Sequence, residues 1–147
     1  MQSLLVGVGG VLVGLLLARQ RSRSSIVRFG VTEKGPFAHA TAHGDTVYLS
    51  GVTAQADGNP ISESDNVEEQ TRRVLDVIDK RLKLAGTDRS KVLHASVWLK
   101  DIARDFGSMN AAWNDWIGTE HKPARATVES KLAKPAMLVE IQVTAAR

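Results

Sequence analysis

Apolar residues recur along this chain with two different periods, and each period predicts a different kind of element. Over residues 67–85 they fall at helical spacing, which predicts one amphipathic helix. Asp65, with Glu68 three positions later, has the form of a capping box at the start of this helix, and Gly86 is placed to end it. A second helix is predicted over residues 104–117. Its apolar positions are Phe106, Met109, Ala112, Trp113 and Trp116.

Alternation with a period of two predicts strands in the other segments. Residues 26–29 have the pattern of a short strand, residues 37–51 of a hairpin, residues 91–100 of a long strand and residues 122–147 of two final strands. The apolar side of the long strand is expected to hold Leu93, Ala95, Val97 and Leu99. This order predicts a two-layer α/β (α+β) domain, in which both helices lie on one face of a mixed six-stranded sheet.

The N-terminal segment differs from the rest of the chain. Residues 1–18 are uncharged and mostly apolar, and three arginines follow within five residues. The run is short of the roughly 20 residues that span a bilayer, and a secretory signal would carry its charge before the run. We predict a targeting or anchor segment over residues 1–25 and a folded domain over residues 26–147. A mitochondrial location is favoured; the alternatives are an anchor that faces the cytosol and a cytosolic protein.

Composition and charge exclude several classes of function. The chain has 147 residues, a formal net charge of +3 and no cysteine, so disulfides and thiolate chemistry are excluded. Beyond the N-terminal segment, basic residues are scattered rather than clustered, which argues against a nucleic-acid partner. The four histidines do not have metal-binding spacing, and we expect no metal site.

The last two predicted strands each carry a charge among alternating residues. In the final strand Val139 and the residues alternating with it are apolar, so Glu140 is expected on the opposite, helix-free face of the sheet. In the preceding strand Ala126 and Val128 take the apolar positions, which places Arg125 on the helix-free face as well. If that face packs against other subunits, two such charges are costly unless they serve a ligand. An ordinary salt bridge at a surface or interface is the alternative.

Three stretches of the chain stand out together: Ser50-Gly51 after an early strand, "VWLKDIARDFGSMNAAW" in mid-chain, and "PARATVESKL…VEIQVTAA" at the end. Together they resemble the RidA (YjgF-type) family of enamine/imine deaminases. The resemblance covers residues 26–147. It implies a chorismate-mutase-like fold and a homotrimer in which the helix-free faces meet and ligand sites lie between subunits.

The resemblance also implies an activity. Similar proteins hydrolyse 2-imino acids such as 2-iminopropanoate and 2-iminobutanoate to 2-oxo acids and ammonia, without a cofactor. Arg125 matches the arginine that binds the substrate carboxylate, a task that suits a planar guanidinium. Glu140 matches the acidic residue that positions or activates the attacking water.

Four further residues are expected around the substrate. The resemblance implies that Ser50 and backbone groups around Gly51 and near Thr127 complete the pocket, while Phe37 and Thr127 stand where many members have tyrosine and cysteine. A non-catalytic trimeric binder of 2-oxo acids is the alternative function. RNA cleavage and a chaperone-like activity are further alternatives, and the first lacks the basic track and stacking aromatics that it would need.

Overall fold

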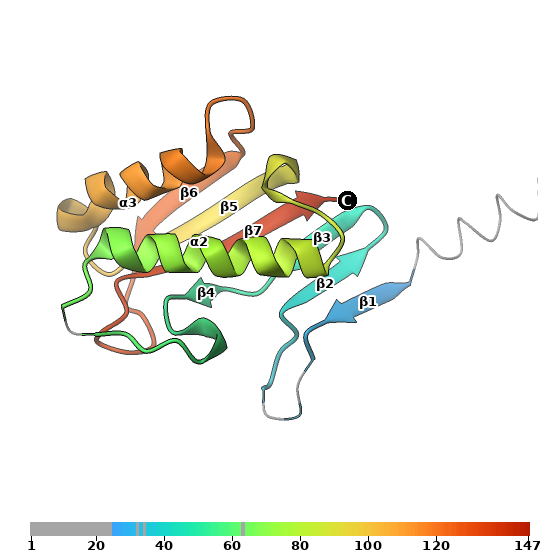
Figure 1. Ribbon diagram of the computed structural model, residues 1–147, viewed down its shortest axis with the longest axis horizontal. Coiled ribbons are helices and arrows are strands. Elements are labelled where there is room, and N and C mark those ends of the chain that lie inside the picture. Colours follow the sequence, from blue (N-terminus) through green and yellow to red (C-terminus); the bar gives the residue numbers. More distant parts are fainter. Residues whose placement is uncertain (1–24, 32, 34, 63) are drawn as a thin grey trace, which may run out of the picture.

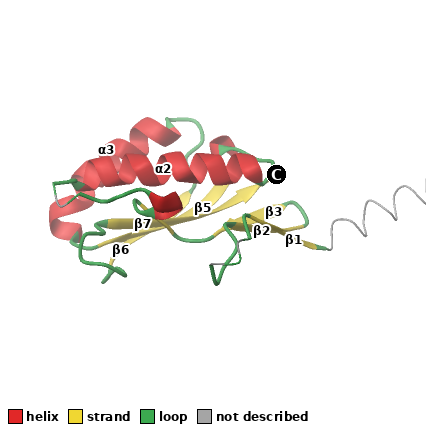
Figure 2. Ribbon diagram, turned by 60° about the horizontal axis from the view of Figure 1, so that its bottom comes forward, coloured by secondary structure: helices red, strands yellow, loops and turns green. Residues whose placement is uncertain are grey.

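The computed structural model describes residues 25–31, 33, 35–62 and 64–147 (Figure 1). The chain forms two layers: a sheet, and two α-helices that both lie on one of its faces (Figure 2). The two-layer architecture, with a mixed sheet and both helices on the same face, is thereby confirmed. The predicted N-terminal segment lies outside the described residues except for Ser25, and it stays a prediction.

The sheet has seven strands rather than the predicted six. They are β1 (Ile26–Phe29), β2 (Ala40–His43), β3 (Thr46–Leu49), β4 (Val52–Thr53), β5 (Val92–Leu99), β6 (Ala124–Glu129) and β7 (Val139–Ala146). Their order is β1-β2-β3-β7-β5-β6, and β4 also pairs with β7. All pairs are antiparallel except β5 with β6. The sequence did not predict β4 because two residues are too few to show a period.

The first helix, α2 (Val67–Leu84), has its cap one residue later than predicted, at Asn66 rather than Asp65. Asn66 is extended, its side chain accepts a hydrogen bond from the Glu69 amide, and the Glu69 carboxylate accepts one from the Asn66 amide, each at 3.0 Å. Asp65 instead forms an ion pair with Arg73 at 2.6 Å. The capping box is therefore Asn66 with Glu69. Gly86, with φ +80°, follows the end of the helix as expected.

The core lies between the helices and the face of the sheet that they cover. α3 (Ile102–Ile117) buries Met109, Ala112, Trp113 and Trp116, whereas Phe106 is 43% exposed and was wrongly assigned to this face. The 3-10 turns are η1 (Ala56–Gly58) and η2 (Arg89–Lys91). No α-helix among the described residues is long and apolar enough to cross a membrane.

The long strand β5 contains an irregularity that the sequence did not reveal. The register with β7 shifts between Val92 and His94, so one additional residue enters the strand there. As a result Val92 is buried in the core, and Leu93, which was expected there, is 52% exposed. From Ala95 onward the predicted alternation holds, with Ala95, Val97 and Leu99 buried.

The cap of α2 generates a stability prediction. Asn66→Ala removes one half of the capping box and should lower the free energy of unfolding by about 1 kcal/mol. The same substitution at Asn114, an exposed position within α3, should leave stability unchanged or raise it by up to about 0.5 kcal/mol. Denaturant unfolding of both variants at one protein concentration checks this. Equal losses at the two positions would contradict the cap.

Candidate active site

Arg125 lies on the helix side of the sheet, which corrects the expectation from the sequence. β6 pairs with β5 in parallel, so that Arg125 is opposite Ala95 and Thr127 is opposite Val97. Residues that are opposite each other in a ladder share a face, and both β5 partners are buried in the core. The alternation of apolar and polar residues predicted the wrong face for Arg125. β6 is an edge strand, and its apolar Ala126 and Val128 point away from the helices.

The guanidinium of Arg125 rests against α3. Its Nη2 donates a hydrogen bond to Asn110 Oδ1 at 2.6 Å, and its central carbon lies 5.1 Å from the ring centroid of Trp113. Burial lowers the pKa of Arg125 from its ordinary value, but arginine stays charged at neutral pH. Nη1 and the Thr127 hydroxyl are both buried without a hydrogen-bond partner among the described residues. These two groups are donors that a ligand oxygen could satisfy.

Glu140 lies on the opposite, helix-free face, as predicted. It is opposite Trp98 on β5 and Thr53 on β4. Its carboxylate lies over Gly51, where a β-carbon would overlap Glu140 Oε1. The absence of a side chain at position 51 therefore makes room for the carboxylate.

Ser50 is tied into the protomer by its own hydrogen bonds. Its amide and its hydroxyl both donate to the carbonyl oxygen of His39, at 3.1 Å and 3.3 Å. The hydroxyl also accepts from Nη1 of Arg81 at 3.1 Å, and Nη2 of Arg81 reaches the carboxylate of Asp57 at 3.2 Å. The hydrogen bonds of Ser50 thus hold the backbone next to Gly51 in place. We did not predict a role for Arg81; the signal was an arginine at an apolar position of the helical pattern.

The predicted site residues form two groups in one protomer. Ser50, Gly51 and Glu140 make one group, and Arg125 with Thr127 makes the other, across the sheet. Phe37, in the connection between β1 and β2, is 55% exposed. No cluster of three or more His, Asp or Glu side chains that could hold a metal occurs in the described part of the chain. The two groups therefore offer a cation that could bind a carboxylate, Arg125, and a separate carboxylate that could accept a proton, Glu140.

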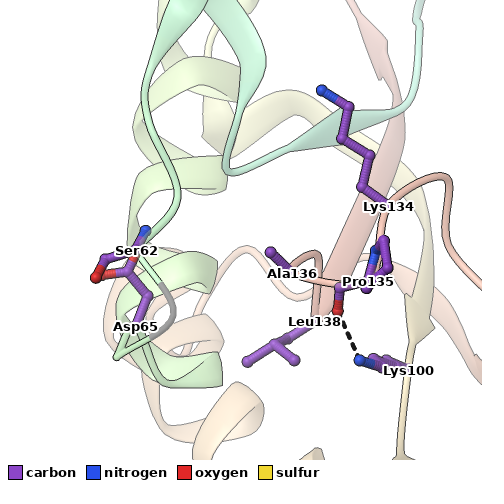
Figure 3. A pocket seen from close by; sticks show the side chains of 7 residues that line it. All are labelled: Ser62, Asp65, Lys100, Lys134, Pro135, Ala136 and Leu138. Atoms are coloured by element: carbon purple, nitrogen blue, oxygen red, sulfur yellow. Dashed lines mark hydrogen bonds between the residues drawn. The ribbon is translucent and has the colours of Figure 1, made fainter.

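A hollow of about 540 Å³ lies elsewhere, between the start of α2 and the segment before β7 (Figure 3). Its lining contains none of the predicted site residues. Lys100 Nζ donates to the Pro135 carbonyl and Lys134 Nζ to the side chain of Gln55, both at 2.6 Å, and Asp65 is paired with Arg73. These charged groups already have partners, so the chemistry points to Arg125 and Glu140 rather than to this hollow.

The fold and these residues match one family. The family model described as "Endoribonuclease L-PSP" matches residues 30–147. A RutC family protein of Haemophilus ducreyi is 37% identical over 121 residues, which are 82% of this chain and 96% of the relative. The RutC family protein YoaB of Escherichia coli is 34% identical over 122 residues, 83% of this chain and 98% of the relative. The chain belongs to this RidA/YjgF family.

Solved structures agree with this assignment. NMB1025 of Neisseria meningitidis, a member of the YjgF protein family, has a TM-score of 0.74 at 34% identity over 85% of this chain and 97% of that one. Yeast Mmf1 has a TM-score of 0.75 at 20% identity over 84% and 99% of the two chains, a likeness in fold. The expected family is confirmed.

The contact between Glu140 and Gly51 generates a second prediction. Gly51→Ala should leave the fold nearly intact, because the overlapped atom is the far end of a flexible side chain, but it should displace the Glu140 carboxylate. A crystal structure of the variant, with its melting temperature, checks both parts. Gly107→Ala is the matched control: a β-carbon there meets nothing within 4 Å, and it should stabilise α3 by up to about 1 kcal/mol. An unmoved Glu140 in Gly51→Ala would contradict the prediction.

Proposed function

We propose that this protein hydrolyses reactive 2-imino acids, which exchange with their enamines, to 2-oxo acids. Water adds to the carbon of the C=N bond, the nitrogen is protonated and the C–N bond breaks, so that one imine and one water give one 2-oxo acid and one ammonia. The observation that carries the proposal is the guanidinium of Arg125, held by Asn110 and Trp113 with an acidic partner absent among the described residues. A guanidinium without an acidic partner is well suited to bind the carboxylate of a substrate.

Glu140 supplies the second requirement of the reaction. A carboxylate can orient water toward the imine carbon and carry its proton toward the departing nitrogen. Among the described residues Glu140 forms no ion pair, so it is free to act on a ligand. A protein that only binds carboxylates has no reason to place an anion beside its ligand. This argument favours the deaminase over a non-catalytic sensor of 2-oxo acids.

The positions of the two charges have a consequence for assembly. Arg125 and Glu140 project from opposite faces of one sheet, so they can act on one small substrate if they come from different copies of the chain. No α-helix of the described residues covers the helix-free face (Figure 2), where Tyr48 is 49% and Val128 48% exposed. Both features support a closed homotrimer with sites between neighbouring subunits.

RNA cleavage, suggested by the description of the family model, has less support here. Five arginines are paired with acidic side chains rather than free to hold phosphates. They are Arg72, Arg73, Arg81, Arg89 and Arg104. The carboxylate site around Arg125 fits a small anion better than a nucleic-acid backbone.

The third prediction tests the roles of the two charges. Arg125→Lys keeps the positive charge but cannot form the planar, bidentate hydrogen bonds of a guanidinium. It should lower kcat/KM for 2-iminobutanoate roughly ten- to a hundredfold. Glu140→Gln should retain binding of 2-oxobutanoate but slow turnover, because an amide cannot accept the proton of water. The assay generates the imine in situ with a pyridoxal-phosphate lyase and follows release of the 2-oxo acid.

Lys131→Arg serves as the control, because Lys131 is exposed and outside both groups of site residues; it should behave as the wild type. If Glu140→Gln turns over the imine at the wild-type rate, the catalytic role of this glutamate is wrong. A wild-type protein that binds 2-oxobutanoate without hastening imine hydrolysis would establish the sensor instead.

The fourth prediction tests whether sites are shared between subunits. Arg125→Ala and Glu140→Gln chains, each with little activity alone, should recover activity when they are unfolded together and refolded as mixtures. In an equal mixture that assembles at random into trimers, about one quarter of the sites receive the intact arginine and glutamate. Sedimentation should show trimers in every sample. Activity that stays at the level of the separate variants would place both residues in one subunit's site.

A further inference from the structure

Two side chains of α3 lie directly behind the proposed carboxylate site. Asn110 and Trp113 are three positions apart, so they occupy one face of the helix, and both contact the guanidinium of Arg125. Asn110 Oδ1 is the one hydrogen-bond acceptor that the described residues offer to this guanidinium. Its central carbon lies over the Trp113 ring, 5.1 Å from the ring centroid.

These contacts restrict the guanidinium in two independent ways. Trp113 is 4% exposed and packs against Trp116, with 5.2 Å between ring centroids, so its ring is itself held in place. The ring limits the movement of the guanidinium on one side, and the hydrogen bond to Asn110 holds its Nη2. A long arginine side chain otherwise loses rotamer freedom when it binds a ligand, and a two-pronged grip needs both N–H groups aligned.

We infer that Asn110 and Trp113 are positioning residues for carboxylate recognition by Arg125, and that they set the affinity of the site for small carboxylates. The inference rests on the proposed function and extends it to residues that do not react. Asparagine suits this task because its amide accepts a hydrogen bond and leaves the positive charge of Arg125 uncompensated. An aspartate at position 110 would pair with the same cation for which the substrate carboxylate competes.

This reasoning predicts opposite effects of one substitution on stability and on binding. Asn110→Asp is nearly isosteric and creates an ion pair with Arg125, so the melting temperature should hold or rise. Binding of 2-oxobutanoate should nevertheless weaken at least about tenfold, because the carboxylate meets a cation that is already paired. A substitution that acted only by disturbing the fold would instead lower binding and stability together.

Trp116 offers a matched control for Trp113. It lies on the same helix, is 8% exposed, and holds the guanidinium of Arg89 at 5.4 Å, outside the proposed site. Trp113→Leu and Trp116→Leu each remove a buried ring beside an arginine, so both should lower the melting temperature. Trp113→Leu should raise the Kd for 2-oxobutanoate and the KM for 2-iminobutanoate by roughly three- to thirtyfold, whereas Trp116→Leu acts only through the Trp113 ring that it contacts and should raise both by clearly less. Trp113→Phe keeps an aromatic face and should recover most of this loss.

The measurements are calorimetric Kd values for 2-oxobutanoate and the separate KM and kcat for 2-iminobutanoate, all with the full-length chain. Equal weakening in Trp113→Leu and Trp116→Leu, or wild-type binding by Asn110→Asp, would overturn the inference. If the wild type binds 2-oxobutanoate but does not hydrolyse the imine, the proposed function fails and the Kd comparison still decides the inference. If the wild type does not bind 2-oxobutanoate, the inference fails too.

Discussion

The pairing of β5 with its two neighbours determines the face from which each site residue projects. β5 runs antiparallel to β7 with Trp98 opposite Glu140, and parallel to β6 with Ala95 opposite Arg125. A slip of one residue in either ladder would move the whole set of side chains to the other face. Burial of Ala95, Val97 and Leu99 under the helices opposes such a slip. The same core contacts that stabilise the fold therefore separate the two charges.

The parallel pair also explains why α3 reaches Arg125. Parallel neighbours need a crossover connection, and here the chain leaves β5, forms α3 over the sheet and returns as β6 (Figure 1). β6 is an edge strand, with β5 as its neighbour in the sheet, and α3 is the helix that precedes it. A residue on the helix side of β6 thus meets the inner face of α3, where Asn110 and Trp113 lie.

The sequence was sufficient for elements that have a long, clear period. Both helices and the two-layer arrangement could be predicted because their apolar positions repeat over several turns. The failures occur where the period is short or interrupted: β4 has two residues, the irregularity at Leu93 inserts a residue, and β6 lies at an edge where apolar residues also face outward. Assigning residues to a face of the sheet by their polarity assumes that the helices cover the apolar side. In the edge strand β6 the apolar residues point away from the helices, so the assumption fails.

The sequence proposes a set of site residues, and that set stays a prediction; the arrangement of these residues in space could not be predicted. Arg125 and Glu140 were named from motifs, while their faces depend on pairing partners that are far away in the sequence. The contacts of Asn110 with Arg125 and of Arg81 with Ser50 join residues 15 and 31 positions apart. Polarity patterns carry no information about such pairs, and the arginine in the buried stripe of α2 was not assigned a role from the sequence.

Separation of the two charges solves an electrostatic problem. A guanidinium and a carboxylate that reached each other within one protomer would form an ion pair, and a substrate would then have to break that pair. On opposite faces they cannot meet within one protomer. Arg125 rests on a neutral amide and an aromatic ring, and Glu140 lies over a glycine. Neither is engaged in an ion pair among the described residues, and the proposed site between two copies of the chain would require this.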